Sequence, residues 1–180
     1  MFLINSYEME EKKLLNRIRL LTVFYIVALL FWGITAFPLE SELAIICNIM
    51  GISEDAAPDT YSGLKYWIAT VYEGLISTNR DFPFLAYGTD WLAFSHIVIA
   101  VAFIGLYFKP IRNIWIVYFG IIACIGVIPL ALICGEIRGI PFYWRMIDCS
   151  FCLFGIIPLY VLRVYIKRLD KITGYIPHKY

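Results

Sequence analysis

The segment Ile114–Cys134, IWIVYFGIIACIGVIPLALIC, contains 21 residues and no charged side chain. A helix of this length rises about 30 Å, which is roughly the thickness of the hydrocarbon layer of a bilayer. Three further apolar segments accompany it, at residues 20–37, 90–108 and 141–164. We therefore predict an all-α, polytopic integral membrane protein, with four transmembrane helices in one bundle and a single membrane domain over residues 1–180.

The composition supports this class. The chain is 61% apolar and 16% charged. A soluble domain is roughly half apolar and about a quarter charged. The basic residues flank the apolar segments and form no separate basic face, which argues against nucleic-acid binding. The expected partners are the lipid bilayer and, beyond it, another membrane protein or a small hydrophobic ligand.

The N-terminal segment, residues 1–19, is polar and precedes the first apolar segment directly. Glu8 and Lys12 have the spacing of a salt bridge within a helix, so this segment either extends the first span as a helix or forms a frayed tail. A basic start followed by an apolar core also matches a signal peptide. Pro38 and Leu39 stand where a cleavage site of small residues would be, so we interpret the first span as a retained helix.

One long connection, residues 38–89, separates the first two spans and carries half of the acidic residues. Residues 39–50 and 62–78 have apolar positions at helical spacing, although neither segment suits a membrane span. We predict that they form short extracytoplasmic capping helices, and a flexible acidic loop is the alternative. The composition of Tyr87–Asp90 indicates a turn and a helix N-cap, so the second span is expected to begin at about Asp90.

Two of the spans carry residues that affect helix packing. Gly120 and Cys124 are four residues apart, a spacing of small residues that lets two helices approach closely. Pro129 and Pro158 each remove a backbone donor and are expected to kink their helices. Residues 135–140 are predicted to form a short loop before the fourth span.

Basic residues are distributed unevenly along the chain. The N-terminal segment, the turn after the second span and the region from Arg163 onward hold 11 of the 15, and the remaining 4 lie at residues 38–89 and 135–145. Cytoplasmic connections are enriched in Lys and Arg. We therefore predict that both termini are cytoplasmic, including a basic tail at residues 165–180, and that residues 38–89 face the outside.

The stretch Gly135–Cys152, GEIRGIPFYWRMIDCSFC, concentrates ionisable groups in an apolar part of the chain. Such groups are costly at membrane depth, so they mark either a working site or a buried pair. Arg145 and Asp148 are three residues apart on one helix face, and His96 is expected at a similar depth in the second span. The candidate ligand-binding residues of the outer face are Asp90, His96, Glu136, Arg138, Arg145 and Asp148.

Two interpretations of this group remain open. In the first, Arg145 and Asp148 neutralise each other and His96 bonds a backbone carbonyl or a tyrosine. In the second, the residues line a polar outer-leaflet pocket in which His96 transfers protons or binds a ligand near neutral pH. The residue types would also suit a metal ion, but no close spacing supports one, so no metal is predicted.

Cys149 and Cys152 form a C-x-x-C motif, for which simple packing of small apolar residues is the alternative. The motif lies near the outer end of the last of four helices, and a long outer connection separates the first two. This layout resembles the vitamin K epoxide reductase family of thiol–quinone oxidoreductases. The resemblance implies redox catalysis by this pair with a quinone. The outer connection holds Cys47 where the family has two cysteines, and Leu153 and Phe154 stand where a hydroxyl residue is expected.

The sequence thus predicts a small integral membrane protein with a polar, ligand-binding pocket in its outer leaflet. The alternative is a membrane thiol–quinone oxidoreductase, and a purely structural membrane component is a third class. Whether the chain is an enzyme stays open. The candidate catalytic residues are Cys149, Cys152 and His96.

Overall fold

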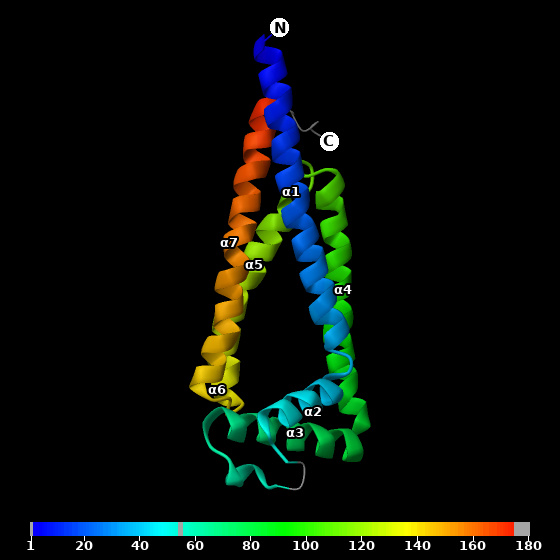
Figure 1. Cartoon of the computed structure of the whole chain (residues 1–180), viewed down its shortest axis with the longest axis vertical. Helices are drawn as coiled ribbons and strands as arrows, with labels where there is room; N and C mark the ends of the chain where they lie inside the picture. The colour runs from blue at the N-terminus through cyan, green and yellow to red at the C-terminus, as the bar shows by residue number, and fades with distance from the viewer. Residues whose placement is uncertain (1, 54–55, 175–180) are drawn as a thin grey trace. The chain divides into compact units, whose positions relative to one another are not determined.

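The computed structural model describes residues 2–53 and 56–174, and within these ranges the chain is helical and contains no strand (Figure 1). Four helical segments are long and apolar enough to cross a membrane. They are Glu8–Thr35, Pro83–Phe108, Ile114–Ile137 and Phe142–Thr173. The prediction of an all-helical chain with four candidate spans is confirmed.

The chain divides into two compact units. The first unit comprises Met1–Ile26 with Val101–Tyr180, and the second comprises Val27–Ala100. Two helices contribute to both units, because α1 (Phe2–Thr35) and α4 (Ala86–Phe108) are continuous across the division.

The helices at the two ends of the chain extend beyond the predicted spans. Helix α1 begins at Phe2, so the N-terminal segment continues the first span and the frayed-tail alternative is wrong. Helix α7 (Phe142–Thr173) continues into the basic tail and ends at Gly174, whose φ of 61° forms a left-handed cap. An ion pair of 2.7 Å between Arg168 and Glu10 joins these two extensions.

The core of the first unit is a row of aliphatic side chains from α1, α4, α5 (Ile114–Pro129) and α7. On α7 its members recur at spacings of three and four residues, the pattern of a helix face that packs against other helices. Thr22, which is fully buried, donates its hydroxyl to the carbonyl of Ile18 at 2.8 Å. The largest fully buried aliphatic side chains of this unit are Ile18, Leu106, Val117, Leu159, Leu162, Ile166 and Leu169.

Helices α5 and α7 lie side by side along a seam of small residues (Figure 1). A Cβ on Gly120 would lie 3.0 Å from Cδ1 of Leu159, and a Cβ on Gly155 would lie 3.3 Å from Sγ of Cys124. The close approach expected from the spacing of Gly120 and Cys124 is therefore confirmed, and Gly155 supplies its counterpart on α7.

The disturbance expected at Pro129 takes the form of a π-helical turn, η3 (Leu130–Cys134). Proline removes one backbone donor, and a wider turn accommodates the resulting gap in the hydrogen-bond ladder. One further helical turn follows, α6 (Gly135–Ile137), so the loop predicted at residues 135–140 is wrong over its first three residues. Helix α7, by contrast, continues as an α-helix through Pro158.

The second unit contains the two helices predicted in the long connection, α2 (Leu39–Met50) and α3 (Gly63–Asp81). Helix α2 ends at Gly51, whose φ of 66° lies in the left-handed region. The pair shares a small core, so the alternative of a flexible acidic loop is wrong. The buried members of this core are Cys47, Ile52, Ile68, Ala69 and Tyr72.

Helix α4 begins earlier than expected. Pro83 opens a 3₁₀ turn, η2 (Pro83–Leu85), which leads directly into α4 at Ala86. The turn and N-cap predicted at Tyr87–Asp90 are therefore wrong, because proline at the start of η2 already provides the helical entry. Further along α4, Gly33 of α1 allows a close crossing, since a Cβ there would lie 3.0 Å from the carbonyl oxygen of Ala93.

Candidate functional site

Arg145 is the most contacted of the predicted site residues in the first unit. Its Nη1 lies 2.5 Å from Oε2 of Glu136 and donates to the carbonyl of Leu132 at 3.2 Å. Its guanidinium also lies 5.4 Å from the ring centre of Phe142. The Arg145 side chain is 11% exposed, whereas that of Glu136 is 71% exposed. This arginine therefore ties the start of α7 to η3 and α6.

Arg145 pairs with Glu136 and not with Asp148, so the first of the two interpretations is wrong about the partner of Arg145. The π-helical turn η3 and the short helix α6 bring the carbonyl of Leu132 and the carboxylate of Glu136 to Arg145 instead. Gly135 leaves room for this arrangement, because a Cβ there would lie 2.6 Å from Cδ of Arg145. The sequence did hold a signal for the contact between Arg145 and Glu136. A glycine stands directly before Glu136, shortly after the helix end that Pro129 disturbs.

Asp148 and Arg138 take part in no ion pair among the described residues. Asp148 is half-buried within α7, and its backbone oxygen accepts a hydrogen bond from Sγ of Cys152 at 3.7 Å. An ionisable side chain without a charge partner inside an apolar helix remains a candidate for function.

Asp90 and His96 belong to the second unit. His96 Nδ1 lies 2.8 Å from the carbonyl of Leu92 one turn earlier, which is the backbone contact that the first interpretation expected. A carbonyl oxygen can only accept a hydrogen bond, so Nδ1 carries the proton in this contact. The other ring nitrogen, Nε2, can then bind a different partner. Asp90 lines a cavity of about 180 Å³ together with Glu40 and Asn79. Coupling between this pair and the four residues of the first unit stays a prediction.

Among the described residues, none of the five cysteines forms a disulfide. Cys152 is buried, Cys149 is half-buried, and Cys47 lies in the α2–α3 core. Redox chemistry at Cys149 and Cys152 therefore stays a prediction. The described residues also contain no group of three or more His, Cys, Asp or Glu side chains placed to hold a metal ion.

A cavity of about 420 Å³ lies beside α3 in the second unit, and we call it the α3 pocket. One side is lined by residues that follow α2, namely 52, 53 and 56–58. The other side is one face of α3. The α3 residues that line the pocket are Ala69, Tyr72, Glu73, Ile76, Ser77 and Arg80.

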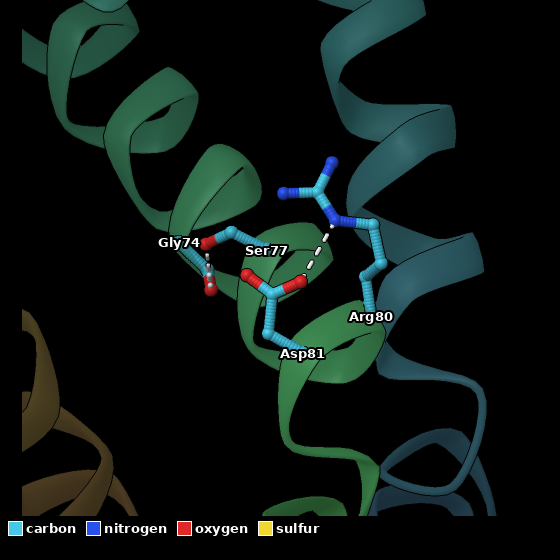
Figure 2. A network of polar contacts seen from close by, with 4 residues as sticks. All are labelled: Gly74, Ser77, Arg80 and Asp81. Carbon is cyan, nitrogen blue, oxygen red and sulfur yellow. Dashed lines mark hydrogen bonds and ion pairs between the residues drawn. The ribbon is translucent and has the colours of Figure 1, made fainter.

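Polar groups gather at one end of this face (Figure 2). Arg80 Nε donates to Oδ1 of Asp81 at 3.0 Å, and the Ser77 hydroxyl donates to the carbonyl of Gly74 at 3.1 Å. The hydrogen bond to Asp81 raises the pKa of Arg80 above its ordinary value. An arginine is a cation at physiological pH in any case. The two terminal nitrogens of Arg80 point away from Asp81 and donate to no described residue.

None of these α3 residues is among the site residues predicted from the sequence. Their spacing held the signal, because Glu73, Ser77 and Arg80 are four and three residues apart and therefore share one helix face. The prediction for this helix rested on its apolar positions, which indicate packing and say nothing about its polar edge. The pocket presents a cation, a carboxylate and a hydroxyl over an apolar floor.

No family model, characterised protein or solved structure matches the chain.

Proposed function

We propose that this chain is a multi-pass integral membrane protein that binds a small polar ligand in the α3 pocket, on the extracytoplasmic side. Membrane insertion is supported by four long apolar helices and by the large apolar side chains that they expose, among them Phe31, Leu92, Ile122 and Phe154. The excess of basic residues at both ends of the chain supports cytoplasmic termini.

The observation that carries the proposal is the polar edge of a preformed cavity. Pockets for small molecules typically measure about 300–1,000 Å³, and the α3 pocket holds about 420 Å³. The buried core of α2 and α3 supports one of its walls, so the cavity does not depend on a ligand to form. The terminal nitrogens of Arg80 suit a carboxylate or phosphate group, because a guanidinium offers two parallel donors.

The charge of the surrounding segment narrows the class of ligand. Residues 38–89 contain seven acidic residues against two basic ones, Lys65 and Arg80. A ligand with several negative charges would be repelled by this surplus, whereas one acidic group is attracted to Arg80. Glu73 on the same face favours a positive group. A small zwitterion of the amino-acid type fits both charges, because its carboxylate can bind Arg80 and its ammonium group can bind Glu73.

The test is ligand-dependent thermal stabilisation of the full chain in mild detergent. The probes are a panel of L-amino acids, with dicarboxylic acids and amines as comparison compounds. We expect one or more amino acids to raise the melting temperature of the wild type and of Lys65→Gln. Lys65 is the matched control, because it is an exposed cation on α3 that does not line the pocket.

Arg80→Gln and Glu73→Gln should remove most of this stabilisation while the unliganded melting temperature changes little, because both side chains are exposed. An unchanged response in Arg80→Gln would contradict the assignment of the pocket. A wild type that responds to no zwitterion, or equally to the dicarboxylic acids, would contradict the assignment of the ligand class.

A further inference from the structure

A second cavity, of about 320 Å³, lies at the basic end of the first unit, and we call it the turn pocket. The turn between α4 and α5, Lys109–Arg112, forms one wall. Glu11 and Leu15 of α1 and Leu169 and Thr173 of α7 form the others. Three separate parts of the chain therefore meet around one hollow within a single unit.

The wall formed by the turn is held rigidly. Asn113 Nδ2 donates to the carbonyl of Gly105 at 2.8 Å and to that of Lys109 at 3.0 Å. The backbone N–H of Asn113 also donates to the carbonyl of Lys109, at 3.1 Å, and Pro110 within the turn is buried. The backbone that carries Lys109 is therefore fixed before any ligand binds.

Most arginines at this end of the unit already have partners. Arg168 pairs with Glu10, and the guanidinium groups of Arg17 and Arg19 lie over the rings of Tyr165 and Tyr107. The ammonium group of Lys109, by contrast, has no ion-pair or hydrogen-bond partner among the described residues. Lys109 is thus a cation in a preformed hollow that is available to an external anion.

The surroundings of the turn pocket are strongly positive. Residues 8–26, 101–112 and 163–174 contain ten basic residues against four acidic ones. Two large aromatic side chains flank the turn, since Phe108 is 67% exposed and Trp115 is 58% exposed. Exposed aromatic residues at the ends of apolar helices mark the level of lipid headgroups in membrane proteins. The pocket therefore combines a positive field with a position at the interface.

We propose that the turn pocket binds the phosphate of an anionic phospholipid, with Lys109 as its main contact and Arg112 beside it. Basic pockets at the cytoplasmic ends of membrane helices are suited to such headgroups. The apolar side chains of Leu15 and Ile111 provide contact for the part of the lipid nearest the acyl chains. Glu11 lowers the positive charge of the lining, so the pocket selects a headgroup with one phosphodiester over a polyphosphorylated one.

This inference rests on the membrane insertion proposed above but is independent of the α3 pocket. The test is native mass spectrometry of the full chain in mild detergent, titrated with phosphatidylglycerol, phosphatidylcholine or a phosphatidylinositol bisphosphate. We expect phosphatidylglycerol to bind the wild type with the highest affinity for the first lipid. Added salt should weaken that binding, because screening reduces attraction between opposite charges.

Lys109→Gln should lower the affinity for the first phosphatidylglycerol roughly fivefold, which is the change expected from one lost interfacial cation. Lys109→Arg should restore it. Lys13→Gln is the matched control, because Lys13 is an exposed lysine of the same unit that does not line the pocket. An equal loss in Lys13→Gln would overturn the proposal in favour of diffuse attraction to the whole basic end.

Three other results would also overturn the proposal. These are binding of phosphatidylcholine with the same affinity as phosphatidylglycerol, tighter binding of the bisphosphate, and displacement of the lipid by inorganic phosphate. The last result would indicate a site for free phosphate. If Lys109→Gln does not fold, the salt response of the wild type and the comparison of the three lipids still decide the outcome. Failure of membrane insertion is recognised separately, by the labelling experiment described below.

Discussion

Arg145 at the start of α7 binds the carboxylate of Glu136 in α6, with Nη1 and Oε2 2.5 Å apart. The two are only nine positions apart in the chain, and a tight turn through Gly139, whose φ is 69°, lies between them. The same guanidinium donates to the carbonyl of Leu132 in the π-helical turn. One side chain therefore holds together η3, α6 and the beginning of α7.

Replacing Arg145 should destabilise the chain more than replacing its acidic partner. Arg145→Gln loses a charged hydrogen bond to the Leu132 carbonyl and should cost about 2 kcal/mol. Glu136→Gln should cost less than about 1 kcal/mol, because the Glu136 carboxylate is 71% exposed and solvent compensates for its loss. Unfolding in detergent followed by circular dichroism measures both values.

A double-mutant cycle tests whether Asp148 belongs to the same unit. The effects of Arg145→Gln and Asp148→Asn should add to within about 0.5 kcal/mol, because the structure pairs Arg145 with Glu136. The effects of Arg145→Gln and Glu136→Gln should not be additive. A large interaction energy between Arg145 and Asp148 would restore the pairing that the sequence suggested.

Helix α5 contains two glycines, Gly120 and Gly126. Adding a methyl group should destabilise the seam between α5 and α7 at Gly120 but not at Gly126. Gly120→Ala places a methyl group 3.0 Å from Leu159, which is buried and cannot withdraw freely, and should cost about 1–3 kcal/mol. Gly126→Ala is the control, because apart from its own chain neighbours and the backbone of its own helix no atom lies within 4 Å of its Cβ position. Equal stability of the two variants in thermal unfolding would mean that the helices are not closely packed at Gly120.

The proposed topology predicts which positions an impermeant thiol reagent can reach in intact cells. After removal of the native cysteines, Ser53→Cys should be labelled and Lys12→Cys should not, since the basic ends are expected in the cytoplasm. Both positions are exposed, so accessibility within the fold does not limit the reaction. Labelling of Lys12→Cys alone would reverse the orientation, and labelling of both would contradict membrane insertion.

The thiol of Cys152 should react slowly in the folded protein. It is 6% exposed and donates to the backbone oxygen of Asp148, so a packing role predicts that it stays reduced and resists alkylation. Acid trapping and alkylation in cells, with and without quinone depletion, measure the fraction of the protein in which this thiol is reduced. A fraction of protein with Cys149 and Cys152 oxidised, changing with quinone level, would support the redox alternative instead.

Much of the fold could be predicted because its signals are local. The apolar run from Ile114 specifies a long helix whatever surrounds it, and the acidic start and glycine stop of residues 39–50 match α2 at both ends. The seam at Gly120 followed from the spacing of small residues. Helix ends were less predictable where proline was involved, since Pro83 started α4 early and Pro129 produced a π-helical turn rather than a simple stop.

The candidate sites were less predictable, because each depends on where the chain returns in space. The sequence by itself determined the four apolar helices, the two short helices between the first pair and the basic character of both ends. Only the tertiary structure decided that Arg145 meets Glu136 and that Lys109 lines a cavity with α1 and α7. It also decided that residues 52, 53 and 56–58 line one cavity with the polar face of α3. Helix periodicity depends on residues that are close together in the sequence. The partner of a charged side chain, by contrast, depends on turns and packing that join distant parts of the chain.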